Sequence, residues 1–151
     1  EVLIVLAIAG LIMLIVFLAV PALQRNSRNT QRRQDVSSTI SAIQEYMNNN
    51  NGKLPTDNNT LTAAINNAKL GFYDVSNLNG ANSTTWRTTA SATVATNASD
   101  VFIINYAKCG SIPAAGTAAI DLSTGGPTKR NVVAVYQSET SSNFQVQCID
   151  M

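Results

Sequence analysis

The sequence predicts an α+β fold, in which a long N-terminal helix packs on a C-terminal antiparallel sheet of about four strands. The helix should be apolar in its first half and amphipathic in its second. Three observations support this prediction: an unbroken apolar run over residues 2–20, a stripe of apolar residues at helical spacing between 36 and 47, and a series of short apolar segments between turn residues after position 100.

The apolar run reads VLIVLAIAGLIMLIVFLAV and contains no charged or polar side chain. Extended to Leu23, it forms about 33 Å of helix, enough to cross a hydrocarbon core of about 30 Å. Buried core helices rarely stay apolar on every face for so long, so a membrane-inserted or self-associating helix is favoured over a core helix. A cleaved secretory signal fits poorly, because the run is long and no small-residue cleavage motif follows it.

Residues 25–52 should continue the same helix as an amphipathic segment, with Gln, Ser, Glu and Arg on its polar faces. We expect the helix to end at about Asn49, because the asparagines of this region are poor helix formers and Gly52 suits a left-handed C-cap. The apolar stripe of this segment consists of Val36, Ile40, Ile43 and Met47.

Pro21 lies inside the predicted helix, where it lacks a backbone N–H and crowds the carbonyl of Phe17. A kink or a locally melted turn is therefore expected there. Residues 11–16 are bulky and apolar and pack well as helix. We expect any break in an assembled filament to be short and to lie within about four residues before Pro21.

Residues 53–151 should form the head, and residues 1–24 should lie outside it. Within the head, 53–100 is a loop-like region rich in Asn, Ser, Thr and Ala, with one short helix from Thr60 to Lys69. The sheet region, 101–151, allows an antiparallel meander whose apolar face covers the helix stripe. Its four predicted strands are Val101–Lys108, Gly116–Leu122, Asn131–Gln137 and Asn143–Ile149.

Composition argues against catalysis. The chain has no histidine, which removes the commonest general base and metal ligand, and two cysteines are too few for a thiolate zinc site. We find no phosphate loop, metal cluster or carboxylate dyad. The net charge of +1 does not indicate a polyanion-binding protein. We therefore expect neither an enzyme nor a bound metal or cofactor.

The two cysteines are Cys109, near the end of one predicted strand, and Cys148, inside another. A disulfide between them is favoured, and two separate buried thiols are the alternative. Closing a loop of about 39 residues would add about 4 kcal/mol of stability on the chain-entropy model. A disulfide would also place the head in an oxidising compartment, outside the cytoplasm.

Four arginines directly after the apolar run indicate the opposite orientation, because basic residues tend to stay on the cytoplasmic side. We give the cysteines more weight, since a basic leader ahead of Glu1 would resolve the conflict. The arginines are expected to form a solvated helix face at the headgroup level, or to contact acids of adjacent subunits such as Asp35, Glu45 or Asp74. They are Arg25, Arg28, Arg32 and Arg33.

The opening EVLIVLAIAG resembles the N-terminus of type IV pilins, whose mature chains begin with an aromatic residue, then TLIE, then an apolar run. Glu1 matches the family's glutamate at the fifth mature position, and Gly10 matches its glycine nine residues later. Pro21 matches the helix-breaking proline less closely, because eleven positions separate it from Gly10, where the common pattern has eight. The resemblance covers the first 25 residues. It implies that four residues and a cleaved leader precede Glu1.

The resemblance implies a structural subunit that polymerises into a surface filament serving adhesion, twitching motility or DNA uptake. Glu1 would pair with the N-terminal amine of a neighbouring subunit and set the axial register, with Gly10 and Pro21 as further assembly residues. The implied partners are other copies of the chain, inner-membrane lipid before assembly, the assembly machinery with its ATPase, and a host or neighbouring cell surface. The filament core would be formed by Val2, Leu3, Ile4, Val5, Leu6, Ile8, Leu11, Ile12, Leu14, Ile15, Phe17 and Leu18.

Two alternatives stay open. A pseudopilin of a type II secretion system shares the same helix but forms a short fibre. Acidic loop residues that bind calcium would favour it, yet the loop 121–130 holds one acid and two bases. A monomeric, single-pass membrane adhesin is the other alternative, and it would not need a glutamate at the edge of the apolar run.

Overall fold

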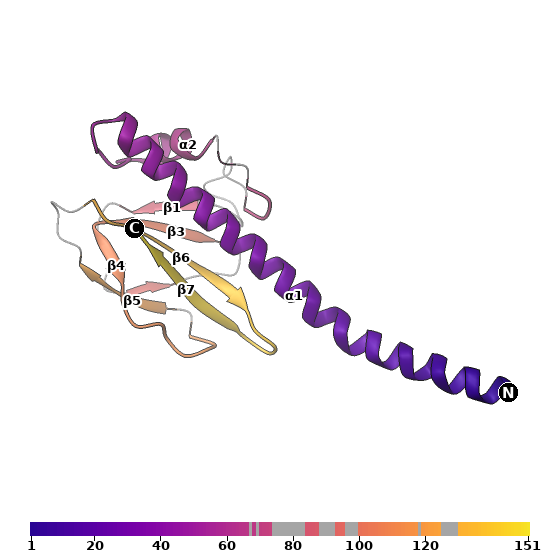
Figure 1. The fold of residues 1–151 in the computed structure, drawn as a ribbon. Helices are drawn as coiled ribbons and strands as arrows, with labels where there is room; N and C mark the ends of the chain where they lie inside the picture. The colour runs from indigo at the N-terminus through magenta and orange to yellow at the C-terminus, as the bar shows by residue number, and fades with distance from the viewer. Residues whose placement is uncertain are drawn as a thin grey trace.

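The chain forms one long helix whose second half lies on a layered head, while its first half projects away from it (Figure 1). The computed structural model describes residues 1–66, 68, 70–73, 84–87, 93–95, 100–117, 119–124 and 130–151. The helix, α1, covers Val2–Asn49 and is about 72 Å long at 1.5 Å per residue. The predicted α+β fold, with a long helix packed on a C-terminal sheet, is confirmed.

Pro21 lies inside α1 without interrupting it. The locally melted turn expected there is absent from the single chain, because the helix remains continuous from Val2 to Asn49. The bulky apolar residues on either side favour helix strongly enough to tolerate one missing backbone hydrogen bond. The break expected inside a filament stays a prediction.

The end of α1 is fixed by backbone geometry at Asn51 and Gly52, both of which have positive φ angles (56° and 76°). The Gly52 N–H donates to the Met47 carbonyl at 2.7 Å and closes the last turn. The guanidinium of Arg130 lies against Gly52 so closely that a Cβ there would collide with it. The left-handed backbone therefore favours glycine at this position, whereas the Arg130 guanidinium, at the end of a flexible side chain, could move aside for a Cβ.

A second helix, α2 (Asn58–Ile65), begins at a capping box. The Asp57 carboxylate accepts from the Thr60 N–H at 2.7 Å, and the Thr60 hydroxyl accepts from the Asp57 N–H at 3.2 Å. This reciprocal pair satisfies two backbone donors at the helix start. The predicted short helix is thus confirmed, although it begins and ends a few residues earlier than expected. Its buried residues, Leu61 and Ile65, face the core beneath α1.

Seven strands lie within the described residues and form two sheets. The main sheet has the order β1-β3-β6-β7, in which β1 is parallel to β3 and the other pairs are antiparallel. The small sheet has the order β2-β5-β4 and is antiparallel. The strands are β1 (Thr84–Arg87), β2 (Thr93–Ala95), β3 (Val101–Asn105), β4 (Ala107–Cys109), β5 (Ala119–Thr124), β6 (Val132–Glu139) and β7 (Phe144–Asp150).

The predicted four-strand meander is wrong in two respects. The segment expected to be one strand, Val101–Lys108, is split at Tyr106, whose φ of 61° turns β4 away from the line of β3. As a result β4 and β5 leave the main sheet and pair with each other in the small one. The last two predicted strands correspond to β6 and β7 within two residues.

The region 53–100 also contains more regular structure than expected. It was predicted to be loop-like apart from one helix, but β1 and β2 lie within it. Both strands are short and contain β-branched Thr or Val, and they gain their hydrogen bonds from β3 and β5. The composition of β1 and β2 alone does not predict these strands, because their pairing partners β3 and β5 lie elsewhere in the sequence.

The central strands β3 and β6 of the main sheet are buried on both faces. The predicted stripe of α1 packs on one face of the sheet, as expected. On that face it forms one core cluster with Val132, Ala134 and Tyr136 of β6. The alternate residues of β6, Val133 and Val135, belong to a second cluster with Leu122 of the small sheet. The head therefore has three layers, consisting of the helices, the main sheet and the small sheet. Burial on both faces explains why β6 reads as a nearly continuous apolar run.

Candidate assembly interface

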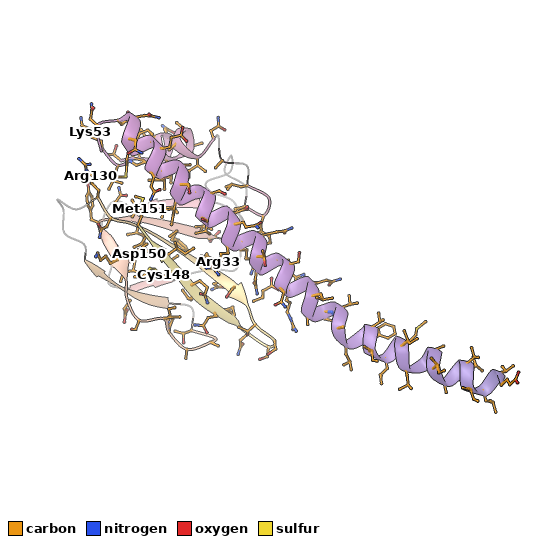
Figure 2. The ribbon with its side chains drawn as sticks, viewed as in Figure 1. Arg33, Lys53, Arg130, Cys148, Asp150 and Met151 are labelled. Atoms are coloured by element: carbon orange, nitrogen blue, oxygen red, sulfur yellow. A yellow bond between two sulfur atoms is a disulfide. The ribbon has the colours of Figure 1, made fainter. Side chains whose placement is uncertain are left out.

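The most exposed apolar surface of the protein is the first half of α1, residues 2–23, which we name the apolar segment. Every side chain from 1 to 24 is exposed (Figure 2). Apart from Ile112, all the exposed large hydrophobic residues of the described chain belong to this segment. By length and composition it could cross a membrane, and none of its apolar window is buried in the head. Burial against the head therefore does not account for its composition.

The twelve residues predicted to form a filament core all lie on this segment and are exposed, with side-chain exposures from 52% at Ile8 to 80% at Leu3. They surround the helix and do not lie on one face of it. A single neighbouring helix could cover only part of such a surface. Full burial requires lipid or several copies of the chain.

Glu1 lies at the N-cap of α1, exposed and without a side-chain hydrogen bond to the helix. Its backbone carbonyl accepts from the Val5 N–H at 3.3 Å. The single chain thus supplies this carboxylate at the edge of the apolar segment with no ion pair among the described residues.

Gly10 and Pro21 lie further along the same helix. No heavy atom lies within 4 Å of the position that a Cβ on Gly10 would take. Glu1, Gly10 and Pro21 are spread over about 30 Å of helix, so the single chain does not bring them together. Gly10 leaves a small-residue gap on the helix surface, the kind of position that lets another helix approach closely.

A polar cluster joins α1 to the hairpin of β6 and β7 where the helix reaches the head. Arg28 binds the Glu139 carboxylate at 2.6 Å, and Arg32 binds its other oxygen at 2.8 Å. The Asn29 amide donates to the Glu139 carbonyl and accepts from the Glu139 N–H, both at 2.7 Å. Arg25 donates to the Ser141 carbonyl at 3.0 Å. We name these six residues the helix–hairpin clamp.

The clamp corrects the predictions made for the arginines. Arg32 is buried (4% exposed), so it does not belong to a solvated helix face, and Arg28 and Arg32 find their acid within the same chain. Asp74 lies outside the described residues. Glu139 was missed because its partners are more than 100 positions away. A signal was available, since positions 25, 28, 29 and 32 continue the helical face that the apolar stripe occupies from Val36 onwards.

Asp35, predicted as a contact for arginines of other subunits, instead holds a loop of its own chain. Its buried carboxylate accepts the N–H groups of Gly71, Phe72 and Tyr73 at 2.7–3.0 Å. The guanidinium of Arg32 lies 4.5 Å from the centre of the Phe72 ring, a cation–π contact. One turn of α1 therefore anchors both the loop after α2 and the end of β6.

Hydrogen bonds from Arg28, together with the charges of Arg32 and Arg28, hold the pKa of Glu139 below its ordinary value of 4.5. A carboxylate with a lowered folded pKa stabilises the fold above its unfolded pKa, and this contribution is lost as the pH falls through the folded value. Glu139→Gln should therefore destabilise the head by about 1–3 kcal/mol at pH 7. The difference from the parent protein should narrow as the pH falls below 4.5.

Denaturant unfolding of the full chain in detergent, repeated from pH 7 to acid, measures both effects. Glu45→Gln is the matched control, because Glu45 is an exposed acid of α1 with no ion pair among the described residues. The Asp57 pKa is also lowered, by the Thr60 N–H, so the parent protein has a second source of acid sensitivity. A destabilisation that does not change with pH would contradict the role of the Glu139 charge.

Cys109 of β4 and Cys148 of β7 form the expected disulfide, with Cα atoms 5.8 Å apart. The bond links the small sheet to the main sheet. The Cys109 N–H also donates to the Asp150 carboxylate at 3.3 Å, so β4 is held to β7 at two adjacent points. Both cysteines pack against the second core cluster.

The described residues contain no group of three or more cysteine or acidic side chains placed to hold a metal ion. Burial raises the pKa of both Tyr73 and Tyr136, which are part of the core around the α1 stripe. These phenols stay protonated at neutral pH and serve as packing residues. Among the described residues, the exposed large hydrophobic side chains other than Ile112 lie in the apolar segment, and both ion pairs lie in the clamp.

No family model, curated protein or solved structure matches this chain.

Proposed function

We propose that this protein is a structural subunit that polymerises through its apolar segment into a type IV pilus-like surface filament. The same segment anchors the subunit in a membrane before assembly. One observation carries the proposal: residues 2–23 project from the head with large hydrophobic side chains 40–80% exposed. Soluble monomers rarely expose so large an apolar surface, so it requires lipid or other copies of the chain.

The two environments differ little in hydrophobic energy. Burial of apolar area is worth about 25 cal/mol per Å² relative to water, but lipid tails are as apolar as a bundle of helices. Transfer from membrane to filament must therefore be driven by close helix packing, by charge pairing at Glu1 and by an external energy source. An assembly machine with an ATPase, as the resemblance to type IV pilins implies, is the partner that would supply the last of these.

The disulfide supports a location for the head outside the cytoplasm. Disulfides persist mainly in oxidising compartments, and the Cys109–Cys148 bond is partly buried against the core cluster beside it. An extracellular filament with a single-pass membrane precursor combines this location with the exposed apolar segment. The cell-surface roles of adhesion, motility and DNA uptake are all compatible with it.

Electron microscopy of material sheared from cells that express the protein tests the proposal. We expect long filaments that label along their length with antibodies against the head. Short fibres confined to the envelope would support a pseudopilin instead. Protein found only in the membrane fraction, with no fibre, would support a single-pass adhesin and overturn the proposal.

A further inference from the structure

The β6–β7 turn, Thr140–Asn143, lies where the helix leaves the head, and its hairpin points along α1 towards the apolar segment (Figure 1). The apolar segment ends at Leu23, and Arg25 follows about 3 Å further along the helix. Arg25 donates to the Ser141 carbonyl at 3.0 Å, which fixes the turn at this level. When the apolar segment spans a bilayer, Arg25 and the turn therefore lie at the headgroup level.

The groups gathered there carry an excess of donors and of positive charge. The clamp holds three guanidinium groups, on Arg25, Arg28 and Arg32, and one carboxylate, that of Glu139, so its formal charge is +2. Arg28 and Arg32 bind this carboxylate, whereas Arg25 binds the Ser141 carbonyl. The Arg28 side chain is about half exposed, so its guanidinium is accessible from solvent although it is paired with Glu139.

The turn adds further donors. The exposed serines Ser141 and Ser142 have hydroxyl and backbone N–H groups that donate no hydrogen bond within the part of the chain that the structure describes. Arg25 uses one of its nitrogens on the Ser141 carbonyl, and its other N–H groups have no acceptor among the described residues. The site can therefore accept an anion with several oxygen atoms.

We propose that Arg25, Arg28 and the Ser141–Ser142 turn bind the phosphate of an anionic phospholipid headgroup. The inference rests on the membrane-inserted stage of the proposed function. Guanidinium groups suit phosphate oxygens, and basic residues next to a membrane span are attracted to anionic lipid. Binding fixes the head on the membrane surface through the hairpin. It must be released when the helix enters a filament.

Native mass spectrometry of the full chain in detergent micelles tests the site with three probes: phosphatidylglycerol, phosphatidylcholine and inorganic phosphate. We expect retention of phosphatidylglycerol about fivefold above phosphatidylcholine. Arg25→Gln should remove this preference, and Arg25→Lys should retain part of it. Lys53→Gln is the charge-matched control and should change nothing, because Lys53 lies at the opposite end of the head (Figure 2). Far-UV circular dichroism checks that each variant is folded.

Equal retention of the two lipids, or an equal loss of preference in Arg25→Gln and Lys53→Gln, would overturn the inference. Retention of inorganic phosphate as strongly as the anionic lipid would show a free-phosphate site and would also overturn it. Flotation with vesicles of either lipid separates this result from the proposed function. Failure to insert contradicts the membrane stage, whereas insertion without lipid preference contradicts only the headgroup site.

Discussion

Glu1→Ala should abolish filament formation, or raise the concentration needed for assembly about 100-fold or more, while the protein still inserts into membranes. In a filament the apolar segments of several copies surround Glu1, and a carboxylate in such a setting requires an opposite charge. We propose that a neighbouring copy provides it. Removing the carboxylate leaves that charge buried without a partner, at a cost of about 3–5 kcal/mol for each contact.

The effect of Glu1→Ala on assembly can be separated from an effect on folding, because the Glu1 side chain makes no hydrogen bond or ion pair within the described part of its own subunit. Its side chain is exposed and makes no capping hydrogen bond, so its loss leaves the head and the clamp unchanged. The measurements are filament yield after shearing and the amount of protein in the membrane fraction. Gln44→Ala, at an exposed position on the same helix outside the apolar segment, is the control. Normal filament yield from Glu1→Ala would remove the assembly role of this residue.

The sequence predicts the helix and its partner face well because both depend on local periodicity. The stripe of Val36, Ile40, Ile43 and Met47 is visible at helical spacing, and all four residues are buried. The sequence also predicts that the apolar segment does not pack on the head as an amphipathic helix, because no face of it is polar. The strands β6 and β7 were found for the same reason, as short apolar runs between turn residues.

Long-range pairing explains most of what sequence reasoning missed. Nothing near Val101–Lys108 indicates that Tyr106 adopts a positive φ and divides the segment into two strands. Tyrosine rarely adopts a positive φ, so its presence does not predict such a turn, whereas a glycine would. The parallel pairing of β1 with β3 depends on a strand that is only four residues long.

The clamp was missed for a related reason, because a charge pattern does not identify its partner. Four arginines after an apolar run suggest lipid or another subunit, and both alternatives treat the helix face as free. In the fold, the end of β6 brings Glu139 to that face, and the buried Arg32 then binds both its carboxylate and the Gln137 carbonyl. The Glu139 carboxylate thereby balances one of the four positive charges that the arginines carry.

Loss of the disulfide should have the largest effect on stability. The bond closes a separation of 39 residues, for which the chain-entropy model gives about 4 kcal/mol. For a head of about 100 residues this corresponds to a fall in Tm of about 15–30 °C. The double variant Cys109→Ala/Cys148→Ala and the reduced parent protein should both show it, measured by thermal unfolding of the full chain in detergent. Reductant should not affect the double variant, which serves as the control.

The size of the loss also reports how the two sheets are held together. Without the disulfide, β4 keeps the hydrogen bond from the Cys109 N–H to Asp150, and the loop beyond it keeps the bond from the Gly116 N–H to the Phe144 carbonyl at 2.7 Å. These contacts order the folded state but do not restrict the unfolded chain, so they cannot replace the entropic effect of the crosslink. Unchanged stability on reduction would contradict this account and would mean that packing of Leu122 and Val146 between the sheets holds the head closed without the crosslink.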